Sequence, residues 1–172
     1  MKSTTQKTWA IAGGIAIALT THQMVQAQSK TSVFECAGCD LRGVDMSVKK
    51  YLDRNLSGAI LRGANLRGAN LSNVVFLGAD FTGADLRGTT LTNTFFTGGA
   101  KLQKADLRGA RMEGTFFTNA DLQNADLRGA VLTDGSLENT NLRGAKVEGM
   151  VMDAFFCRTT MPDGTMRNDN CP

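Results

Sequence analysis

The sequence predicts an all-β solenoid, in which the chain turns a corner after every five residues and winds into a square coil. Three observations lead to this prediction. An apolar residue recurs at every fifth position, a small residue usually precedes it by two, and Gly, Asn or Asp usually follows it by two. Helices place apolar residues at a period of 3.6 and flat strands at a period of 2, so neither explains this pattern.

The central apolar residues mark twenty units, with one extra residue at Gly98-Gly99. They are Leu56, Leu61, Leu66, Leu71, Phe76, Phe81, Leu86, Leu91, Phe96, Leu102, Leu107, Met112, Phe117, Leu122, Leu127, Leu132, Leu137, Leu142, Val147 and Met152. Each is expected to point toward the axis of the coil. A core built in this way needs few aromatic residues, and only 6% of the chain is aromatic.

The residues on either side of each centre complete the unit, as in Ala64-Asn65-Leu66-Arg67-Gly68. The alanine can point inward beside the large residue without overfilling the core. Gly, Asn and Asp accept tight turns and positive φ, so we expect the corners at these residues.

These units resemble those of the pentapeptide-repeat family, which read A(D/N)LXX. The resemblance runs from about Cys39 to Phe156 and implies a right-handed quadrilateral β-helix with four units per coil. We expect about five to six coils, and the regular units alone give a prism roughly 25 Å tall if coils pair like strands. Lys49 and Arg54 break the pattern, because unpaired cations would point inward. We therefore expect an irregular first coil there.

The 172 residues divide into four segments. Residues 1–27 are predicted to be a secretory signal peptide, with Lys2 and Lys7 before the apolar run WAIAGGIAIAL. An uncleaved anchor is the alternative, but the run is shorter than the roughly 20 residues that span a bilayer. The other segments are an N-terminal cap at 28–55, the β-helix at 56–156 and a C-terminal tail at 157–172.

Cleavage after Ala27 would lower the formal charge from +3 to +1, because the leader holds two lysines and no acids. An almost neutral exported protein has no electrostatic attraction to nucleic acid. The family resemblance implies an exported, cyanobacterial-type protein of the periplasm or thylakoid lumen.

Residues one coil apart should stack on the same side, and one side then carries two files of charge. The files are Asp85, Asp106 and Asp126, and Arg67, Arg87, Arg108 and Arg128. They could bind a cation or a basic partner. The alternative is that the two charge ladders neutralise each other and serve solubility, because exposed ion pairs contribute little to binding or stability.

Another side carries Val75, Phe95, Phe116 and Phe156 just before the centres, interrupted by Ser136. This file is a candidate docking strip for a protein partner, since contiguous apolar surface often marks an interface. The alternative is a packed aromatic ladder with Phe156 buried under the C-terminal tail.

The four cysteines lie only at the ends of the predicted solenoid. Cys157 and Cys171 are the first choice for a structural disulfide, which would hold the tail over the last coil with Pro162-Asp163-Gly164 as a turn. Cys36 and Cys39 form a CxxC that we interpret as a structural disulfide or thiol pair. A redox motif would require a strand followed by a helix.

Without the leader the chain contains no His, since His22 is the only one, and no Trp, since Trp9 is the only one. We expect no enzyme, cofactor or metal site, because a straight prism offers no deep pocket. The predicted function is a scaffold or protein-interaction module with an unknown protein partner, no nucleic acid and no membrane after cleavage. It would be a monomer or a weak homodimer. The alternative is a DNA mimic that regulates an enzyme such as gyrase, which the charge and the leader disfavour.

Overall fold

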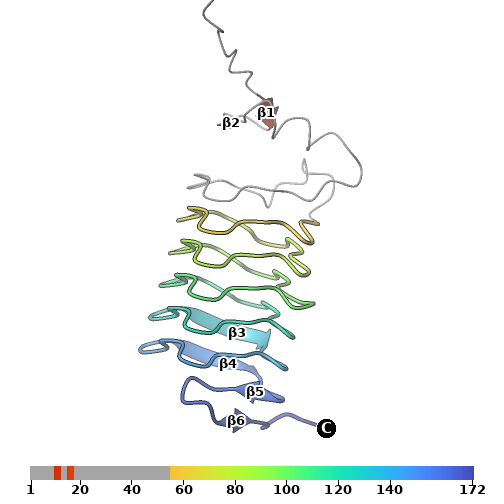
Figure 1. Ribbon diagram of the computed structural model, residues 1–172, viewed down its shortest axis with the longest axis vertical. Coiled ribbons are helices and arrows are strands. Elements are labelled where there is room, and N and C mark those ends of the chain that lie inside the picture. Colours follow the sequence, from red (N-terminus) through yellow and green to blue (C-terminus); the bar gives the residue numbers. More distant parts are fainter. Residues whose placement is uncertain (1–9, 13–14, 18–54) are drawn as a thin grey trace, which may run out of the picture.

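A computed structural model describes residues 10–12, 15–17 and 55–172 (Figure 1). The two short N-terminal segments are strands β1 (Ala10–Ala12) and β2 (Ile15–Ile17), which pair antiparallel. The predictions for Cys36, Cys39, Lys49, the signal-peptidase site and the irregular first coil lie outside the described residues. From residue 55 onward the chain forms a stack of coils that follow one another in sequence order.

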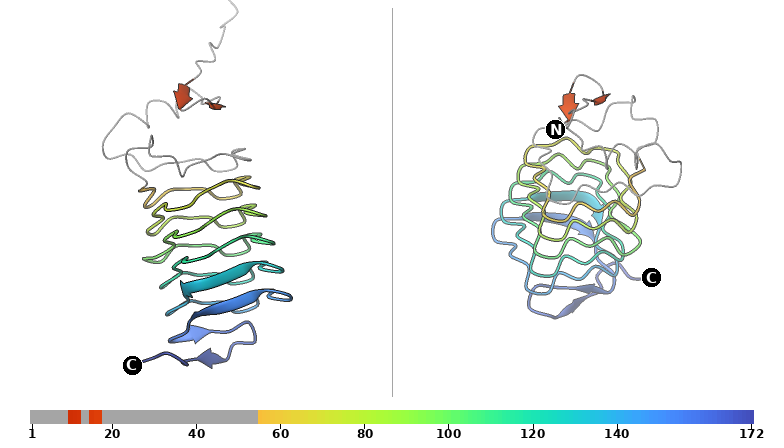
Figure 2. Two further views of the ribbon diagram at one scale, coloured as in Figure 1. Left: turned by 180° about the vertical axis from the view of Figure 1, so that it is seen from behind. Right: turned by 45° about the horizontal axis from the view of Figure 1, so that its top comes forward.

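A regular coil contains 20 residues and has four sides. Parallel bridges join Ile60 to Asp80, Asn65 to Asp85, Asn70 to Thr90 and Val75 to Phe95, so one bridge falls on each side (Figure 2). On one side, the Leu66 N–H donates to Asp85 O at 2.8 Å, and the Asp85 N–H donates to Ala64 O at 2.9 Å. The square coil predicted from the five-residue period is confirmed.

The extra residue at Gly98-Gly99 lengthens the register from 20 to 21, because Asp80 bridges to Lys101. Both glycines have positive φ, 60° and 80°. The insertion is therefore absorbed at a corner, and the bridges on either side of it keep their pairing.

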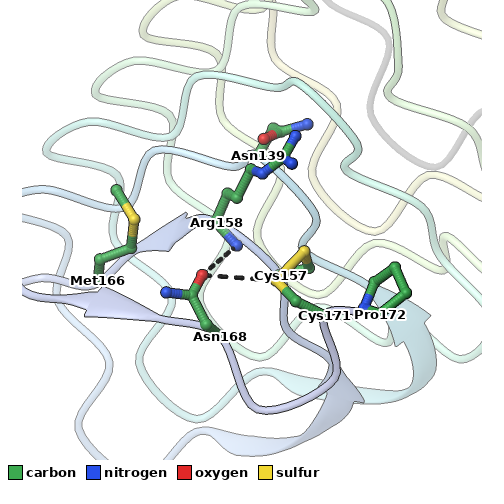
Figure 3. A pocket seen from close by; sticks show the side chains of 7 residues that line it. All are labelled: Asn139, Cys157, Arg158, Met166, Asn168, Cys171 and Pro172. Carbon is green, nitrogen blue, oxygen red and sulfur yellow. Dashed lines mark hydrogen bonds between the residues drawn. A yellow bond between two sulfur atoms is a disulfide. The ribbon is translucent and has the colours of Figure 1, made fainter.

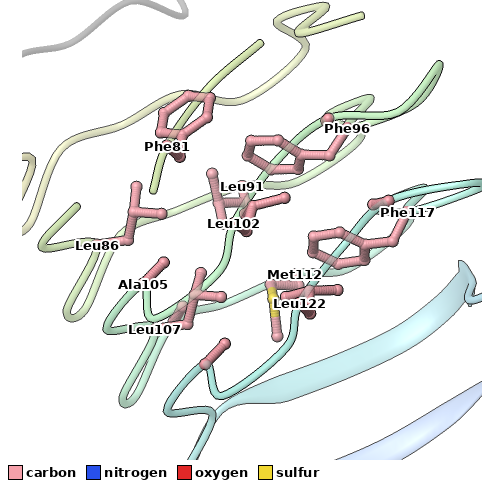
Figure 4. Close-up of a cluster of buried hydrophobic side chains, with 14 of the residues drawn as sticks. Phe81, Leu86, Leu91, Phe96, Leu102, Ala105, Leu107, Met112, Phe117 and Leu122 are labelled. Atoms are coloured by element: carbon pink, nitrogen blue, oxygen red, sulfur yellow. The ribbon is translucent and has the colours of Figure 1, made fainter. Parts of the chain in front are cut away.

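The core consists of the central residues and the small residues beside them (Figure 4). Phe76, Phe96 and Phe117 stack in successive coils with ring centroids 5.2 and 5.3 Å apart. Where the inward alanine is replaced by threonine, its hydroxyl donates to a backbone carbonyl. Thr115 Oγ1, for example, lies 2.7 Å from Leu91 O. Burying this hydroxyl among apolar side chains therefore costs little free energy, because it is hydrogen-bonded.

The corners have the predicted left-handed backbone. Asn73, Asn93 and Asn119 have φ between 54° and 63°, and most glycines two residues after a centre have positive φ as well. Two corners were not predicted. Lys104 has φ 59° and Arg158 has φ 52°, although both carry long side chains that disfavour this conformation.

One corner of the last coil differs from the others. Strand β3 (Val131–Ser136) pairs in parallel with β4 (Val151–Phe155), and the register shifts between Thr133 and Gly135. Asp134 has no counterpart in β4, so Ser136 pairs with Phe155 after 19 residues rather than 20. A Cβ on Gly135 would lie 2.4 Å from Thr115 O, which explains the glycine at an inward position.

The end of the solenoid is closed by β5 (Thr159–Thr160) and β6 (Met166–Arg167), which pair antiparallel. The coil register continues past the predicted end at residue 156, because Asn141 still bridges to Thr160. The chain then turns back at Pro162-Asp163-Gly164, as predicted, with φ 87° at Gly164.

We predict that Gly135→Ala lowers the free energy of unfolding by about 1–3 kcal/mol, the usual cost of overpacking. The added methyl group would meet a backbone carbonyl, which cannot move aside. Chemical denaturation measures the effect. Gly109→Ala is the control, because its Cβ would meet nothing within 4 Å and only its positive φ is strained. A smaller loss for Gly135→Ala than for the control would contradict the steric explanation.

We predict that Lys104→Asn raises the free energy of unfolding by about 1 kcal/mol, because Asn accepts the left-handed region more readily than Lys. Lys104→Gln serves as the control, since Gln removes the same charge but keeps a long side chain that disfavours positive φ. Equal denaturation midpoints for the two variants would show that the corner at Lys104 is not strained.

Candidate functional site

The phenylalanine face, defined as Val75, Leu77, Phe95, Phe116 and Phe155, is one side of the prism. Phe95 and Phe116 bridge successive coils, and their rings stack with centroids 5.1 Å apart and planes within 3°. Both stay partly exposed, at 38% and 36%, beside the more exposed Leu77. The sequence therefore placed Phe95 and Phe116 correctly on one outward file.

The placement of Phe156 on this face is wrong. Phe155 occupies the outward position, with 40% exposure, whereas Phe156 is 3% exposed and belongs to the core. The shortened last coil is the cause, because it moves the file by one residue. A sequence signal was present: Phe155-Phe156 repeats the outward-inward doublets Phe95-Phe96 and Phe116-Phe117. The alternative interpretation, burial of Phe156 under the tail, is confirmed.

Exposed apolar side chains gather on two adjoining sides of the prism. Of the seven large hydrophobic residues that are exposed in the described chain, four lie on the phenylalanine side, and Val131 and Val151 lie on the side before it. The outward residues flanking the centres of the phenylalanine side, from Asn55 to Phe155, carry a charge only at Glu138. The phenylalanine side is therefore uncharged at its outward positions except at Glu138, whereas the side before it also carries Arg111, Glu113 and Asp153.

The charge ladders lie on another side and are paired with each other. Arg108 Nη2 lies 2.7 Å from Asp106 Oδ2, and Arg128 Nη2 lies 2.6 Å from Asp126 Oδ2. Arg87 forms an ion pair with Asp85 and lies 3.6 Å from Asp106. The ladders thus cross-link successive coils. Arg67 begins the file next to Asn65, whose Oδ1 accepts the Arg67 N–H at 3.3 Å.

The aspartates of this side also hold the backbone. Oδ1 of Asp106 accepts the N–H of Arg108 at 3.2 Å, and Oδ1 of Asp126 accepts that of Arg128 at 3.3 Å. This bond explains why Asp or Asn precedes so many centres, a role that the sequence patterns did not reveal. Because the carboxylates already bind arginine and backbone, the geometry favours the structural interpretation over a cation-binding strip.

The hydrogen bonds from arginine set the ionisation of these groups. The side-chain hydrogen bond from Arg128 lowers the pKa of Asp126 to about 2, with further lowering from the Arg128 backbone N–H and charge. The hydrogen bond from Arg87 likewise lowers the pKa of Asp85. Both carboxylates are therefore charged throughout the neutral and mildly acidic range.

The C-terminal cap, residues 157–172, is fastened over Phe156. Cys157 and Cys171 form a disulfide with Cα atoms 4.8 Å apart, as predicted. The Phe156 N–H donates to Asn170 Oδ1 at 2.9 Å, and the Asn170 N–H donates to Phe156 O at 3.0 Å. The Arg167 guanidinium lies 3.6 Å from the centre of the Phe156 ring.

An open depression of about 700 Å³ lies beside the disulfide (Figure 3). Its lining consists of Asn139, Cys157, Arg158, Met166, Asn168, Cys171 and Pro172. Asn168 accepts the Arg158 N–H at 2.8 Å, so its polar groups serve the cap itself. Among the described residues, no group of three or more His, Cys, Asp or Glu side chains could hold a metal. Across residues 10–12, 15–17 and 55–172, no helix is long and apolar enough to cross a bilayer.

Comparison with protein families gives the decisive match. The family model for pentapeptide repeats matches residues 59–98, 99–134 and 114–149, which together cover more than half of the chain. The chain belongs to the pentapeptide-repeat family. The resemblance deduced from the A(D/N)LXX units is thereby confirmed, as is the β-helical fold class. No curated protein sequence matches this pentapeptide-repeat protein significantly.

Several solved structures are similar to this pentapeptide-repeat protein. HetL, involved in heterocyst differentiation regulation in the cyanobacterium Nostoc sp. strain PCC 7120, is 29% identical over 77% of this chain and 64% of its own, with a TM-score of 0.40. This chain thus spans just under two thirds of HetL. A pentapeptide-repeat protein from the cyanobacterium Cyanothece is 30% identical over 77% of this chain and 99% of its own, with a TM-score of 0.41. One from the Arabidopsis thaliana thylakoid lumen is 35% identical over 63% and 64%, with a TM-score of 0.28.

We predict that Cys157→Ser together with Cys171→Ser lowers the free energy of unfolding by about 3 kcal/mol, the loop-closure contribution of a cross-link of this length. The sequence separation is 14 residues. Denaturation with and without a reductant measures the loss, and reduction of the native chain should reproduce it. Unchanged stability in both experiments would mean that the cap holds without the disulfide.

We predict that stability falls as the pH is lowered from about 4 to about 2. The folded pKa of Asp126 is about 2 and its ordinary value is 3.8. The unfolded chain therefore binds a proton before the folded chain does, and the stabilisation present above pH 4 is lost on acidification. Asp126→Asn should flatten this part of the pH profile. A pH profile that this substitution leaves unchanged would contradict the assignment.

Proposed function

We propose that this protein is a non-enzymatic, exported scaffold or protein-interaction module that docks a protein partner through the phenylalanine face. The observation that carries the proposal is the stacked and exposed pair Phe95 and Phe116, with Leu77 above and Phe155 below on the same side. Apolar side chains gathered in this way on a soluble surface are typical of an interface.

The chemistry of the face defines the kind of partner. The residues directly before its centres are apolar or uncharged from Val75 to Phe155. The bridges between successive coils hold them at a regular spacing. A partner would therefore present a flat apolar surface with little charge. The charged residues of the aspartate–arginine side are already engaged with each other, which leaves them less free to contribute to recognition.

Export is part of the proposal. The disulfide between Cys157 and Cys171 supports it, because disulfides persist in oxidising compartments. The periplasm and the thylakoid lumen are the proposed destinations, with residues 1–27 as the leader. We also propose that the β-helix is right-handed and has about five to six coils, as the family resemblance implies.

The alternative, mimicry of duplex DNA, requires a strongly acidic surface. Here each of Asp85, Asp106 and Asp126 has an arginine partner. The file of carboxylates is therefore neutralised along its length, which argues against electrostatic competition with DNA.

The test compares Phe95→Asp with Phe116→Asp in one variant against the native chain, by affinity capture from the exported compartment of the native host. The two introduced carboxylates would be buried in the interface when the partner binds. They should abolish binding, because burying a charge without a counterion is costly. Thr90→Asp with Thr92→Asp is the control, since it adds the same charge on the neighbouring side. If every captured protein still binds the phenylalanine variant, the docking proposal is wrong.

A further inference from the structure

The last coil leaves one backbone edge open on the aspartate–arginine side. In the coil above, the Leu127 N–H donates to Lys146 O at 2.7 Å and the Gly129 N–H donates to Glu148 O at 3.1 Å. The equivalent donors of the last coil are the N–H groups of Val147 and Gly149. Neither has a hydrogen-bond partner within the described part of the chain.

The open edge also has a free acceptor. Ala125 O accepts the Lys146 N–H at 2.9 Å, whereas its equivalent one coil later, Ala145 O, accepts nothing from the residues that the structure describes. The tail does not supply these bonds, because β6 turns back to pair with β5. The segment 145–149, which we call the terminal edge, therefore offers the alternating donors and acceptors of an unpaired strand.

The side chains of the terminal edge reverse the charge order of the ladders. In the three coils above, an aspartate precedes the centre and an arginine follows it. In the last coil Lys146 stands in the aspartate file, bridged to Asp126, and Glu148 stands in the arginine file, where its charge acts on Arg128. A further strand in the same register would meet a cation before its centre and an anion after it.

The apolar part of the edge is incompletely covered. Val147 and Met150 are only partly buried, although they pack against the core. In every earlier coil of the described chain the residue equivalent to Val147 is a leucine that is almost fully buried, such as Leu107 and Leu127. One more large apolar side chain at the centre of an added strand would complete this burial.

We propose that the terminal edge binds an extended peptide segment of a partner protein by strand addition, with the order small residue, acid, large apolar residue, base, glycine. The acid lies against Lys146, the apolar residue covers Val147, and the base lies against Glu148. This is the order of the unit Ala125-Asp126-Leu127-Arg128-Gly129, which occupies the same side one coil earlier. The proposal uses a different surface from the phenylalanine face and does not depend on it.

An extended segment is a better occupant than a second copy of the chain. In the described chain, the units of this side from Asp85 to Gly129 pair with the coils above and below, so they cannot join another edge. A second copy would have to offer its own terminal edge, and sedimentation tests that pairing. A peptide without fixed structure brings unpaired backbone groups along its whole length, which is the usual requirement for strand addition.

The experiment titrates the full-length chain with the synthetic peptide acetyl-GADLRGA-amide and follows binding by calorimetry. Deuterium exchange locates the site: saturating peptide should slow exchange at Val147 and Gly149 and leave the opposite sides of the coil unchanged. The control peptide carries an N-methyl group on its aspartate, which removes the donor for Ala145 O. It should bind at least tenfold more weakly.

Charge reversal supplies an independent arm. Lys146→Glu with Glu148→Lys should weaken binding of the native peptide about tenfold, the effect of two exposed ion pairs turned into repulsions. The swapped peptide acetyl-GAKLEGA-amide should restore it. This rescue also verifies that the variant is folded, and circular dichroism checks it separately.

Three results of the peptide experiments would overturn the proposal. They are no saturable binding of the peptide, protection outside residues 145–150, or equal affinities in all four combinations of peptide and protein. Analytical ultracentrifugation tests whether a second copy of the chain occupies the edge instead. If the full-length chain self-associates and the charge-reversed variant does not, the edge pairs with a second copy and the peptide proposal is wrong.

Discussion

The parallel hydrogen-bond ladder between successive coils is the constraint on which the rest of this structure depends. Each side contributes bonds such as Leu86 N–H to Asp106 O at 2.8 Å and Asp106 N–H to Ala84 O at 2.9 Å. To keep this register the chain must turn four times in every coil. Left-handed corners such as Asn73 and Gly88 make these turns, and the register then fixes which side chains lie one above another.

Because of this register, residues at equivalent positions of successive units on one side stack on each other. Inward positions must fit a narrow core, so alanine alternates with leucine or phenylalanine, and threonine is accepted where its hydroxyl finds a carbonyl, as Thr140 finds Phe117 O. At outward positions, side chains of the same kind stack on each other from coil to coil. The same rule produces the apolar phenylalanine face and the paired ladders of Asp106 and Arg108, two surfaces of opposite character on one short prism.

A solenoid must also end, and this one ends unevenly. The shortened unit at β4 brings Phe156 into the core, and the disulfide and Arg167 hold the cap over it. The cap covers the sides occupied by β5 and β6, while the edge at Val147 and Gly149 keeps its hydrogen-bonding groups free of partners in the described chain. Protection of one half of the end and exposure of the other follow from where the chain turns back at Pro162.

The sequence by itself determined the repeat, the square coil and most of its corners, because each follows from a local pattern of five residues. It also made Cys157–Cys171 the first choice for a disulfide, from the position of the cysteines. It also identified Phe95 and Phe116 as neighbours. Only the tertiary structure decided that Phe155 rather than Phe156 lies outside, that Lys104 is a strained corner and that the aspartates bind the backbone two residues on. The position of Phe155 depends on the hydrogen-bond register between coils, which the one-residue deletion in the unit at β4 changes. The other two depend on backbone geometry within a unit, which the pattern of residue types does not give.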